Sequence, residues 1–229
     1  MTEQRESALL TALAGERTLL GRSSTAERVS AVLRERIIEG SLPPGLRLSE
    51  DVISQALGVS RNTLREAFRL LAHERLLVHE LNRGVFVRRL APEDLTDLFR
   101  IRRMIELGAV QSVGVIPPDQ LTALRAAVDQ AREAATEDRW GDVGTANMRF
   151  HQSIAHLAGS PRIAEVMDQV LAELRLVFHV MADPHRFHEP YIERNAEVLR
   201  LLEAGATAAS VEALAGYLDD AEEQLLAAM

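Results

Sequence analysis

The chain has 229 residues, of which 47% are hydrophobic and only 4% aromatic, and it contains no cysteine. This length allows one large or two modest domains, and the composition predicts cores of Leu, Val, Ile and Ala, as in helical proteins. The absence of cysteine excludes disulfides, thiolate metal sites and cysteine nucleophiles. No apolar run resembles a signal peptide or a membrane-spanning helix, so we expect a cytoplasmic protein without a membrane partner.

The formal net charge of −8 is distributed unevenly along the chain. Residues 1–90 contain 14 arginines and 11 acidic residues, whereas residues 91–229 contain 12 arginines and 23 acidic residues. This asymmetry indicates a basic part that binds nucleic acid, followed by an acidic part with another role. An ordinary solvated acidic surface is the alternative interpretation of the second part.

The first part of the chain is predicted to be an arm followed by a helix. Residues 1–23 have an interrupted apolar pattern, and we expect a flexible N-terminal arm. A clear helical pattern extends from Thr25 to Glu39, and Gly40 ends it. Ser41 to Gly45 (SLPPG) is predicted to be a rigid turn before a short extended piece. One face of the helix is predicted to consist of Val29, Val32, Leu33, Arg36 and Ile37.

Two short helices joined by a tight turn are predicted between Ser49 and Arg69. Gly58 ends the first helix, because glycine accepts the left-handed backbone that a helix exit often needs. Ser60 supplies a hydroxyl at the N-cap of the second helix. Apolar residues recur at spacings of three and four, as in helices packed on one core. They are Val52, Ile53, Ala56, Leu57, Val59, Leu64, Ala67 and Phe68.

Polar side chains at the start of the second helix are typical of a recognition helix that enters the major groove of DNA. Arginine can bind guanine O6 and N7 together, and asparagine can bind adenine in the same way. A helix N-terminus also attracts phosphate. The candidate side chains are Arg61, Asn62, Thr63 and Arg65. A helical hairpin with a solvated polar face is the alternative.

A β-hairpin is predicted after these helices. Residues 76–78 form the first strand, residues 80–83 turn the chain, and residues 84–87 return it. A two-stranded wing after a helix-turn-helix makes a winged helix. Three arginines could reach the minor groove or the phosphates. They are Arg83 at the tip and Arg88 and Arg89 at the base.

From Pro92 onward the pattern predicts helices only. The first extends to about Val115, and a second begins at the proline pair Pro117–Pro118. Four more are predicted over residues 141–158, 161–181, 188–204 and 207–228. Six amphipathic helices predict an all-α bundle.

Residues 25–89 resemble the N-terminal domain of the GntR family of bacterial transcription regulators. The matching pieces are SLPPGLRLSE, LGVSRNTLREAFRLLAHERLL and NRGVFV, in this order. An arginine that contacts DNA in the fatty-acid-responsive branch is replaced here by Asp51, so base preference is expected to differ there. The resemblance implies that the DNA-binding residues are Arg47, Ser49, Ser60, Arg61, Asn62, Thr63, Arg65, Arg83 and Gly84.

Residues 92–226 resemble the all-helical FCD effector domain of one large branch of this family. The matching pieces are DLFRIRRMIE, RFHQSIAHLAGSP and LLEAGATAASVEAL. The resemblance implies that Arg102 faces a ligand carboxylate, which arginine binds well through two parallel hydrogen bonds. A salt bridge to Glu106 on the same helix face is the alternative for Arg102, and a satisfied core histidine is the alternative for His151.

Many FCD domains hold a divalent metal with one Asp and three His ligands. At the four corresponding positions this chain has Asn147, His151, Asn195 and Tyr217. Neutral amide and phenol groups bind first-row metals poorly, so we expect no cofactor and no tight Zn or Ni site. Instead, these four residues are predicted to bind an effector directly. Three further histidines could form a second metal site or a pH-sensitive loop, or be ordinary surface histidines: His179, His185 and His188.

Together, these observations predict a mainly α protein. A winged helix-turn-helix with a small β-hairpin wing occupies residues 24–90, and a six-helix effector-binding and dimerisation bundle occupies residues 91–229. The expected function is that of a homodimeric repressor that binds operator DNA under the control of a small carboxylic acid. One alternative is a regulator without an effector, whose C-terminal half only dimerises. A helical metal-dependent enzyme is remote, because the expected catalytic motifs are missing.

Overall fold

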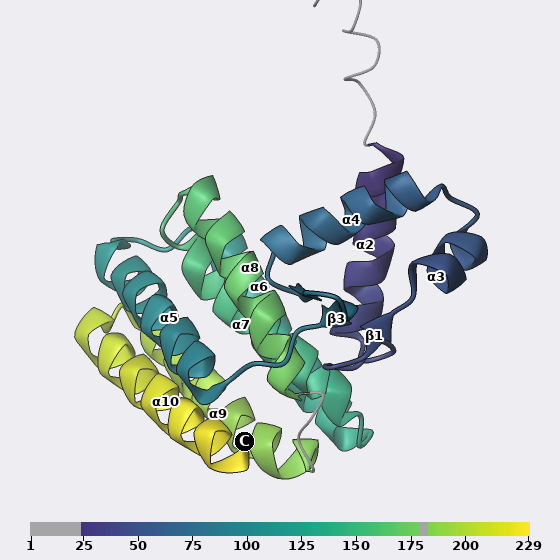
Figure 1. Cartoon of the computed structure of the whole chain (residues 1–229). Coiled ribbons are helices and arrows are strands. Elements are labelled where there is room, and N and C mark those ends of the chain that lie inside the picture. Colours follow the sequence, from purple (N-terminus) through teal and green to yellow (C-terminus); the bar gives the residue numbers. More distant parts are fainter. Residues whose placement is uncertain (1–23, 179–182) are drawn as a thin grey trace, which may run out of the picture. The chain divides into compact units, whose positions relative to one another are not determined.

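The computed structural model describes residues 24–178 and 183–229, so the predicted N-terminal arm and His179 lie outside it. The described residues form nine helices and one three-stranded sheet (Figure 1). They divide into two compact units. The first comprises the described residues up to Leu42 together with Leu46–Val87, and the second comprises Pro43–Gly45 and Arg88–Met229. No described helix combines the length and apolar character that crossing a membrane requires.

Helix α2 (Thr25–Ile38) begins with a capping box, in which Ser24 and Glu27 each bind the other's backbone N–H. Such a cap satisfies two backbone donors that the first helical turn leaves free. The predicted face is only partly buried, because Val32 and the Arg36 side chain are 42% and 53% exposed. The side chains that face the core are Ala26, Val29, Ser30, Leu33 and Ile37.

The helix-turn-helix consists of α3 (Glu50–Leu57) and α4 (Arg61–His73). Gly58 has the left-handed conformation that was predicted (φ 64°), and Ser60 caps α4 by accepting a hydrogen bond from the Thr63 backbone N–H at 3.1 Å. The buried face of α4 is the predicted one, extended by one turn. It consists of Leu64, Ala67, Phe68 and Leu71, each 0% exposed.

The prediction that α3 packs its apolar residues into the same core is wrong. None of the described residues of α3 is buried, and Val52 and Leu57 are 65% and 38% exposed. The eight-residue helix contacts α4 along only part of its surface, so periodicity alone overstates its burial.

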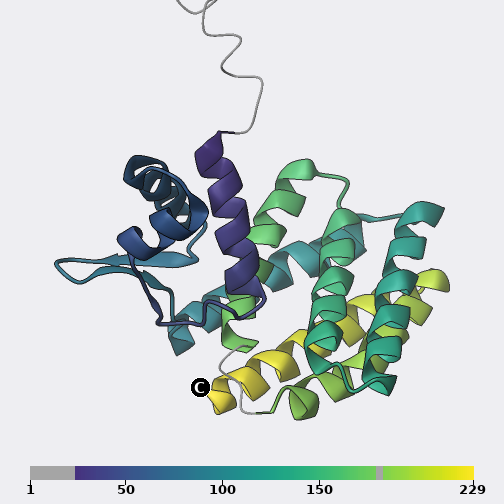
Figure 2. The ribbon, with the colours of Figure 1, turned by 90° about the vertical axis from the view of Figure 1, so that its right-hand side faces the viewer.

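The sheet contains the predicted hairpin of β2 (Leu77–Glu80) and β3 (Gly84–Val87), which projects to the left in Figure 2. Positive φ angles occur at Asn82 (61°) and Gly84 (112°), as the tip requires. The prediction of only two strands is incomplete. The extended piece before α3 is β1 (Arg47–Leu48), which pairs antiparallel with β3 and gives the order β1-β3-β2.

The second unit contains six helices among its described residues, as predicted. The elements are α5 (Pro92–Ser112), α6 (Pro118–Thr136), α7 (Trp140–His156), α8 (Pro161–Phe178), α9 (Pro184–Glu203) and α10 (Thr207–Ala228). Helix α9 begins four residues earlier than predicted, because the Asp183 carboxylate accepts from the Arg186 backbone N–H and Pro184 suits the first turn.

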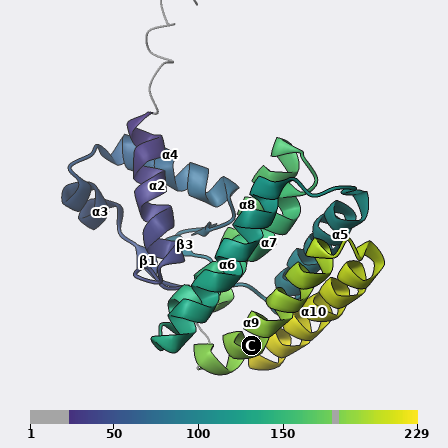
Figure 3. The same cartoon turned by 180° about the vertical axis from the view of Figure 1, so that it is seen from behind.

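Helix α7 is the central helix of this bundle. It contacts α5, α6, α8 and α9, while α10 lies along α5 and α9 (Figures 1 and 3). Large buried side chains from several helices fill the core around α7, including Phe99, Phe150 and Leu174. Polar residues on α7 that point inward are therefore surrounded by protein on all sides.

Candidate DNA interface and buried polar site

The predicted recognition residues lie at the exposed N-terminal end of α4. The side chains of Arg61 and Arg65 are 65% and 57% exposed, and Asn62 is also exposed. Thr63 is half-buried, and its hydroxyl lies 2.8 Å from the Ser60 hydroxyl. Ser60 and Thr63 therefore shape the start of the helix, while the two arginines and Asn62 remain accessible to a partner.

Acidic residues of α3 pair with both exposed arginines. Arg61 Nη2 lies 2.8 Å from Asp51 Oδ1, and Arg65 Nε lies 2.9 Å from Glu50 Oε2. Sequence reasoning missed these pairs, although the two consecutive acids in the first turn of α3 were a visible signal. Each pair is solvent-exposed and contributes little to stability, so DNA can displace it at small cost.

Four of the predicted DNA-binding residues surround one surface groove of about 420 Å³. They are Arg47, Ser49, Arg61 and Gly84, and the lining is completed by Leu48, Glu50, Asp51 and Val85. A Cβ atom on Gly84 would lie 3.3 Å from Arg47 Nε, so the glycine allows this arginine to approach the wing closely. Arg83 does not line the groove; it pairs with Glu80, and its guanidinium lies over the Phe86 ring.

A cluster of polar side chains occupies the interior of the helical bundle. Arg102 and Glu106 on α5 and His151 on α7 are 3%, 0% and 1% exposed. Arg102 Nε donates to Glu106 Oε1 at 2.8 Å, and His151 Nδ1 lies 2.6 Å from Glu106 Oε2. The salt-bridge alternative for Arg102 is therefore the arrangement in the structure, and the contact between His151 and Glu106 was not predicted from the sequence.

The other three predicted effector residues continue this cluster. Asn147 lies one turn before His151, and its Oδ1 accepts from Asn195 Nδ2 at 2.6 Å and from the Tyr217 hydroxyl at 2.8 Å. The centroids of the His151 and Tyr217 rings are 4.7 Å apart. The structure thus brings all five predicted residues together with Glu106, and we call these six residues the buried polar cluster.

Burial and charge together fix the protonation states within the cluster. Burial by itself raises the pKa of Glu106, but the neighbouring Arg102 and His151 outweigh it, and the net pKa is below the ordinary value. Burial also lowers the pKa of His151, which Glu106 opposes only in part. Glu106 is therefore a carboxylate at neutral pH, and His151 is a neutral imidazole.

Comparison with known proteins identifies two domains in this chain. The model of the bacterial regulatory proteins of the gntR family matches residues 25–87, and the model of the FCD domain matches residues 97–220. The chain belongs to the GntR family. It is a DNA-binding transcription regulator with a winged helix-turn-helix and an FCD domain.

Several GntR proteins are similar over much of the chain. The crystal structure of a GntR transcriptional regulator from Rhodococcus sp. RHA1 is 48% identical, with a TM-score of 0.86, and the match covers 90% of this chain and all of that one. The probable D-xylose utilization operon transcriptional repressor of Paenarthrobacter nicotinovorans is 27% identical over 81% of this chain and 82% of its own length. The HTH-type transcriptional regulator YdhC of Bacillus subtilis is 28% identical over 60% of this chain. The match covers only 62% of the length of that relative.

The metal site implied by the FCD resemblance does not fit these side chains. The Asn147 amide oxygen already accepts two hydrogen bonds, and His151 Nδ1 is bound to Glu106. Within residues 24–178 and 183–229, no three His, Cys, Asp or Glu residues are placed to hold a metal ion. We therefore derive no role for Zn or Ni in this FCD domain.

The described histidines near the start of α9 do not converge on one point. The His185 ring stacks on Trp140 with centroids 3.9 Å apart, while His188 packs against the rings of Phe178 and Phe187. The surface interpretation is wrong for His188, which is only 3% exposed. Its Nε2 would lie 2.7 Å from a Cβ on Gly144, so glycine at that position of α7 makes room for the imidazole.

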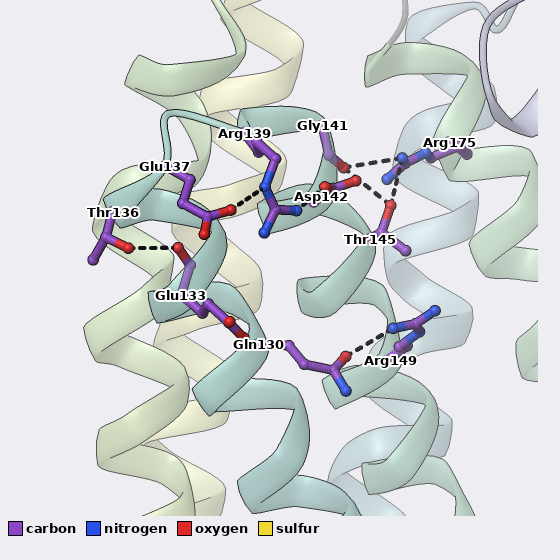
Figure 4. A network of polar contacts seen from close by, with 10 residues as sticks. All are labelled: Gln130, Glu133, Thr136, Glu137, Arg139, Gly141, Asp142, Thr145, Arg149 and Arg175. Atoms are coloured by element: carbon purple, nitrogen blue, oxygen red, sulfur yellow. Dashed lines mark hydrogen bonds and ion pairs between the residues drawn. The ribbon is translucent and has the colours of Figure 1, made fainter.

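A second polar network lies on the α6–α7 surface of the FCD domain (Figure 4). It lines a shallow pocket of about 230 Å³. Arg139 pairs with Glu137 and Asp142, and Arg149 donates to the neutral amide of Gln130. Arg175 donates to the Gly141 carbonyl and the Thr145 hydroxyl. The contacts of Arg149 and Arg175 join α7 to α6 and α8 and give the network a structural role.

Proposed function

We propose that this GntR protein is a cytoplasmic, homodimeric repressor whose operator binding is controlled by a small molecule in the FCD domain. The names of its relatives support repression, since the Paenarthrobacter protein and others are called repressors. The observation that carries the effector proposal is the buried polar cluster, because it places six polar side chains, two of them an ion pair, in the interior of the bundle.

A domain that served only for dimerisation would gain nothing from this cluster. Replacement of a buried ion pair by well-packed apolar residues is often neutral or stabilising by about 1–4 kcal/mol. Moreover, three buried atoms of the cluster have no hydrogen-bond partner among the described residues: Arg102 Nη2, His151 Nε2 and Asn195 Oδ1. A buried polar atom without a partner costs about 1–3 kcal/mol. A ligand that binds these atoms supplies a reason for their presence, which favours the effector over the dimerisation-only alternative.

Control by the effector would follow from a shift between two populations of the dimer. One population places the two recognition helices at the spacing of an operator with two half-sites, and the other does not. A ligand that binds the second population more tightly releases DNA, and a tenfold difference in affinity shifts the equilibrium by about 1.4 kcal/mol. Within each winged helix, Arg61, Asn62 and Arg65 would read bases, while Arg47 and Ser49 would contact phosphate.

The proposal can be tested on operator DNA selected from a random duplex library by the purified protein. The low-molecular-mass fraction of an extract from the encoding bacterium should release this DNA from the wild-type protein. The Tyr217→Phe variant removes the hydroxyl that positions Asn147, so about ten times more of the fraction should be needed. Tyr191→Phe is a matched control, because it removes a phenol hydroxyl that binds Gln224 outside the cluster.

Two results would contradict the proposal. If the fraction never releases operator DNA, the protein has no effector in that extract and the dimerisation-only alternative is favoured. If Tyr217→Phe and Tyr191→Phe respond like the wild type, an effector exists but does not bind at the cluster. Sedimentation of the free protein tests the dimer separately. A monomer at micromolar concentration would exclude a dimer that presents two recognition helices to one operator.

A further inference from the structure

The unpartnered atoms of the buried polar cluster define what a ligand must offer. Arg102 Nη2 carries hydrogens and can only donate, whereas Asn195 Oδ1 can only accept. The role of His151 Nε2 depends on which ring nitrogen carries the hydrogen. The tautomer of His151 therefore decides whether the cluster presents mainly donors or mainly acceptors.

The contact with Glu106 settles the tautomer of His151. Its Nδ1 lies 2.6 Å from a carboxylate oxygen of Glu106, and a carboxylate can only accept. The single hydrogen of the neutral imidazole is therefore on Nδ1, where it is donated to Glu106. His151 Nε2 is left with a lone pair, and it is an acceptor.

The orientation of the Asn195 amide follows in the same way. Asn147 Oδ1 accepts from both the Tyr217 hydroxyl and Asn195 Nδ2. Rotation of the Asn195 amide by half a turn would place two carbonyl oxygens 2.6 Å apart. Asn195 therefore directs Nδ2 toward Asn147 and keeps Oδ1 as its free acceptor. The cluster thus presents two acceptors, His151 Nε2 and Asn195 Oδ1, and one donor, Arg102 Nη2.

The charge of the cluster is already balanced without a ligand. The Arg102 guanidinium and the Glu106 carboxylate lie 2.8 Å apart, and both side chains are almost completely buried. A simple carboxylate would add a net negative charge to this interior and would turn oxygen lone pairs toward two acceptors. An ammonium group would satisfy the acceptors but would lie close to Arg102. Hydroxyl groups avoid both problems, because each donates one hydrogen bond and accepts others.

We propose that the effector is an uncharged polyhydroxyl compound of the sugar or polyol class. Two of its hydroxyls donate to His151 Nε2 and Asn195 Oδ1, and one of its oxygens accepts from Arg102 Nη2. This inference rests on the proposed function, which places the effector at the cluster. It replaces the expectation of a carboxylic acid, since Glu106 supplies from within the protein the carboxylate that binds Arg102.

Isothermal titration calorimetry of the full chain tests the ligand class with five probes. D-Ribose, D-glucose and xylitol are uncharged polyhydroxyl compounds, D-gluconate adds a carboxylate to the same hydroxyls, and hexanoate has a carboxylate without hydroxyls. We expect saturable binding of at least one uncharged probe with a Kd of about 1 mM or lower. Saturation separates site binding from the general stabilisation that sugars give by exclusion from the protein surface.

Two matched variants locate the binding. Asn195→Leu removes the free acceptor and leaves Asn147 bonded to Tyr217, so the fold should persist and affinity for the uncharged probe should fall about tenfold. Gln224→Leu removes an amide that accepts from Tyr191 outside the cluster, and its affinity should equal that of the wild type. Equal affinity of Asn195→Leu and the wild type would place the ligand elsewhere and overturn the inference.

The remaining outcomes distinguish the ligand class from the function. Binding of hexanoate, or of D-gluconate without any uncharged probe, would overturn the uncharged class while the effector function stands. If no probe binds but the extract fraction still releases operator DNA, the class is also wrong and the function again stands. If the extract fraction fails as well, both proposals fall together.

Discussion

Arginine–carboxylate pairs occur in both compact units, with the same N–O distance but in opposite surroundings. The Arg61–Asp51 pair in the winged helix and the Arg102–Glu106 pair in the FCD domain both have an N–O distance of 2.8 Å. The side chains of Arg61 and Asp51 are 65% and 69% exposed, whereas those of the buried pair are 3% and 0% exposed. Water screens the first pair and leaves it free to exchange partners, but the second pair cannot separate without leaving a charge in an apolar interior.

This difference explains how the two units use the same residue types. At the surface, an arginine that already has an acidic neighbour can still turn to DNA, since the exposed pair contributes at most about 1 kcal/mol. In the core, the pair fixes the orientation of His151 and therefore the pattern of free donors and acceptors. The following predictions test this contrast, from the largest expected effect to the smallest.

Glu106→Gln should destabilise the FCD domain severely. The amide cannot neutralise Arg102, and removal of one partner of a buried pair costs about 3–5 kcal/mol. Urea unfolding followed by the helical signal measures the change. Glu50→Gln removes the exposed partner of Arg65 and is the matched control, for which we expect a loss of less than about 1 kcal/mol. Similar losses in both variants would show that burial does not distinguish the two pairs.

Acidification should destabilise the FCD domain through His188. Burial, together with the nearby Arg175, lowers the pKa of this imidazole from 6.5 to about 4. The unfolded chain therefore binds a proton that the folded chain excludes. As a result, the free energy of unfolding falls by up to about 3 kcal/mol as the pH falls from about 6.5 to about 4. His151 has a lowered pKa as well and acts in the same direction.

The His188→Gln variant isolates the contribution of this residue. Its unfolding free energy, measured in urea at several pH values, should fall less steeply than that of the wild type between pH 6.5 and 4. Parallel curves for the two proteins would mean that His188 is protonated as easily in the folded as in the unfolded chain.

Arg65→Ala should weaken operator binding without affecting the fold. A bidentate contact to a base contributes about 1–3 kcal/mol, so the affinity should fall by between about fivefold and about 150-fold. Gel retardation with the selected duplex measures it. Arg69→Ala removes an exposed arginine further along α4, which pairs with Glu66, and should have a smaller effect. Unchanged affinity of Arg65→Ala would exclude it from the recognition surface.

Asp51→Asn should change binding to DNA of arbitrary sequence rather than stability. Release of Arg61 from its acidic partner leaves one more free cation for phosphates, so affinity should rise severalfold. The slope of log affinity against log salt concentration should become more negative by about one. Glu66→Gln removes the same charge from α4 but releases Arg69 instead of Arg61. If both variants bind arbitrary DNA equally, the effect is not specific to the Arg61–Asp51 pair.

Local features of the winged helix were predictable because backbone sterics act over a few residues. Gly58, Ser60 and the Asn82–Gly84 tip have the predicted roles, since a left-handed exit, a hydroxyl cap and a hairpin turn depend on neighbours in the chain. The six FCD helices were also predicted, with errors of a few residues at their ends. The exposure of α3 was not predicted, because apolar spacing does not tell how deeply a short helix packs.

The amino-acid sequence by itself determined the order of the elements, the exposed arginines on α4 and the six side chains available to a polar site. Tertiary structure alone decided which of those side chains meet. Glu106 and His151 are 45 residues apart, and Asn147 and Tyr217 are 70 residues apart, yet both pairs form hydrogen bonds across the bundle. The packing of α5, α9 and α10 around α7 sets these contacts, and the low dielectric of that interior turns an ordinary Arg–Glu pair into a fixed part of the site.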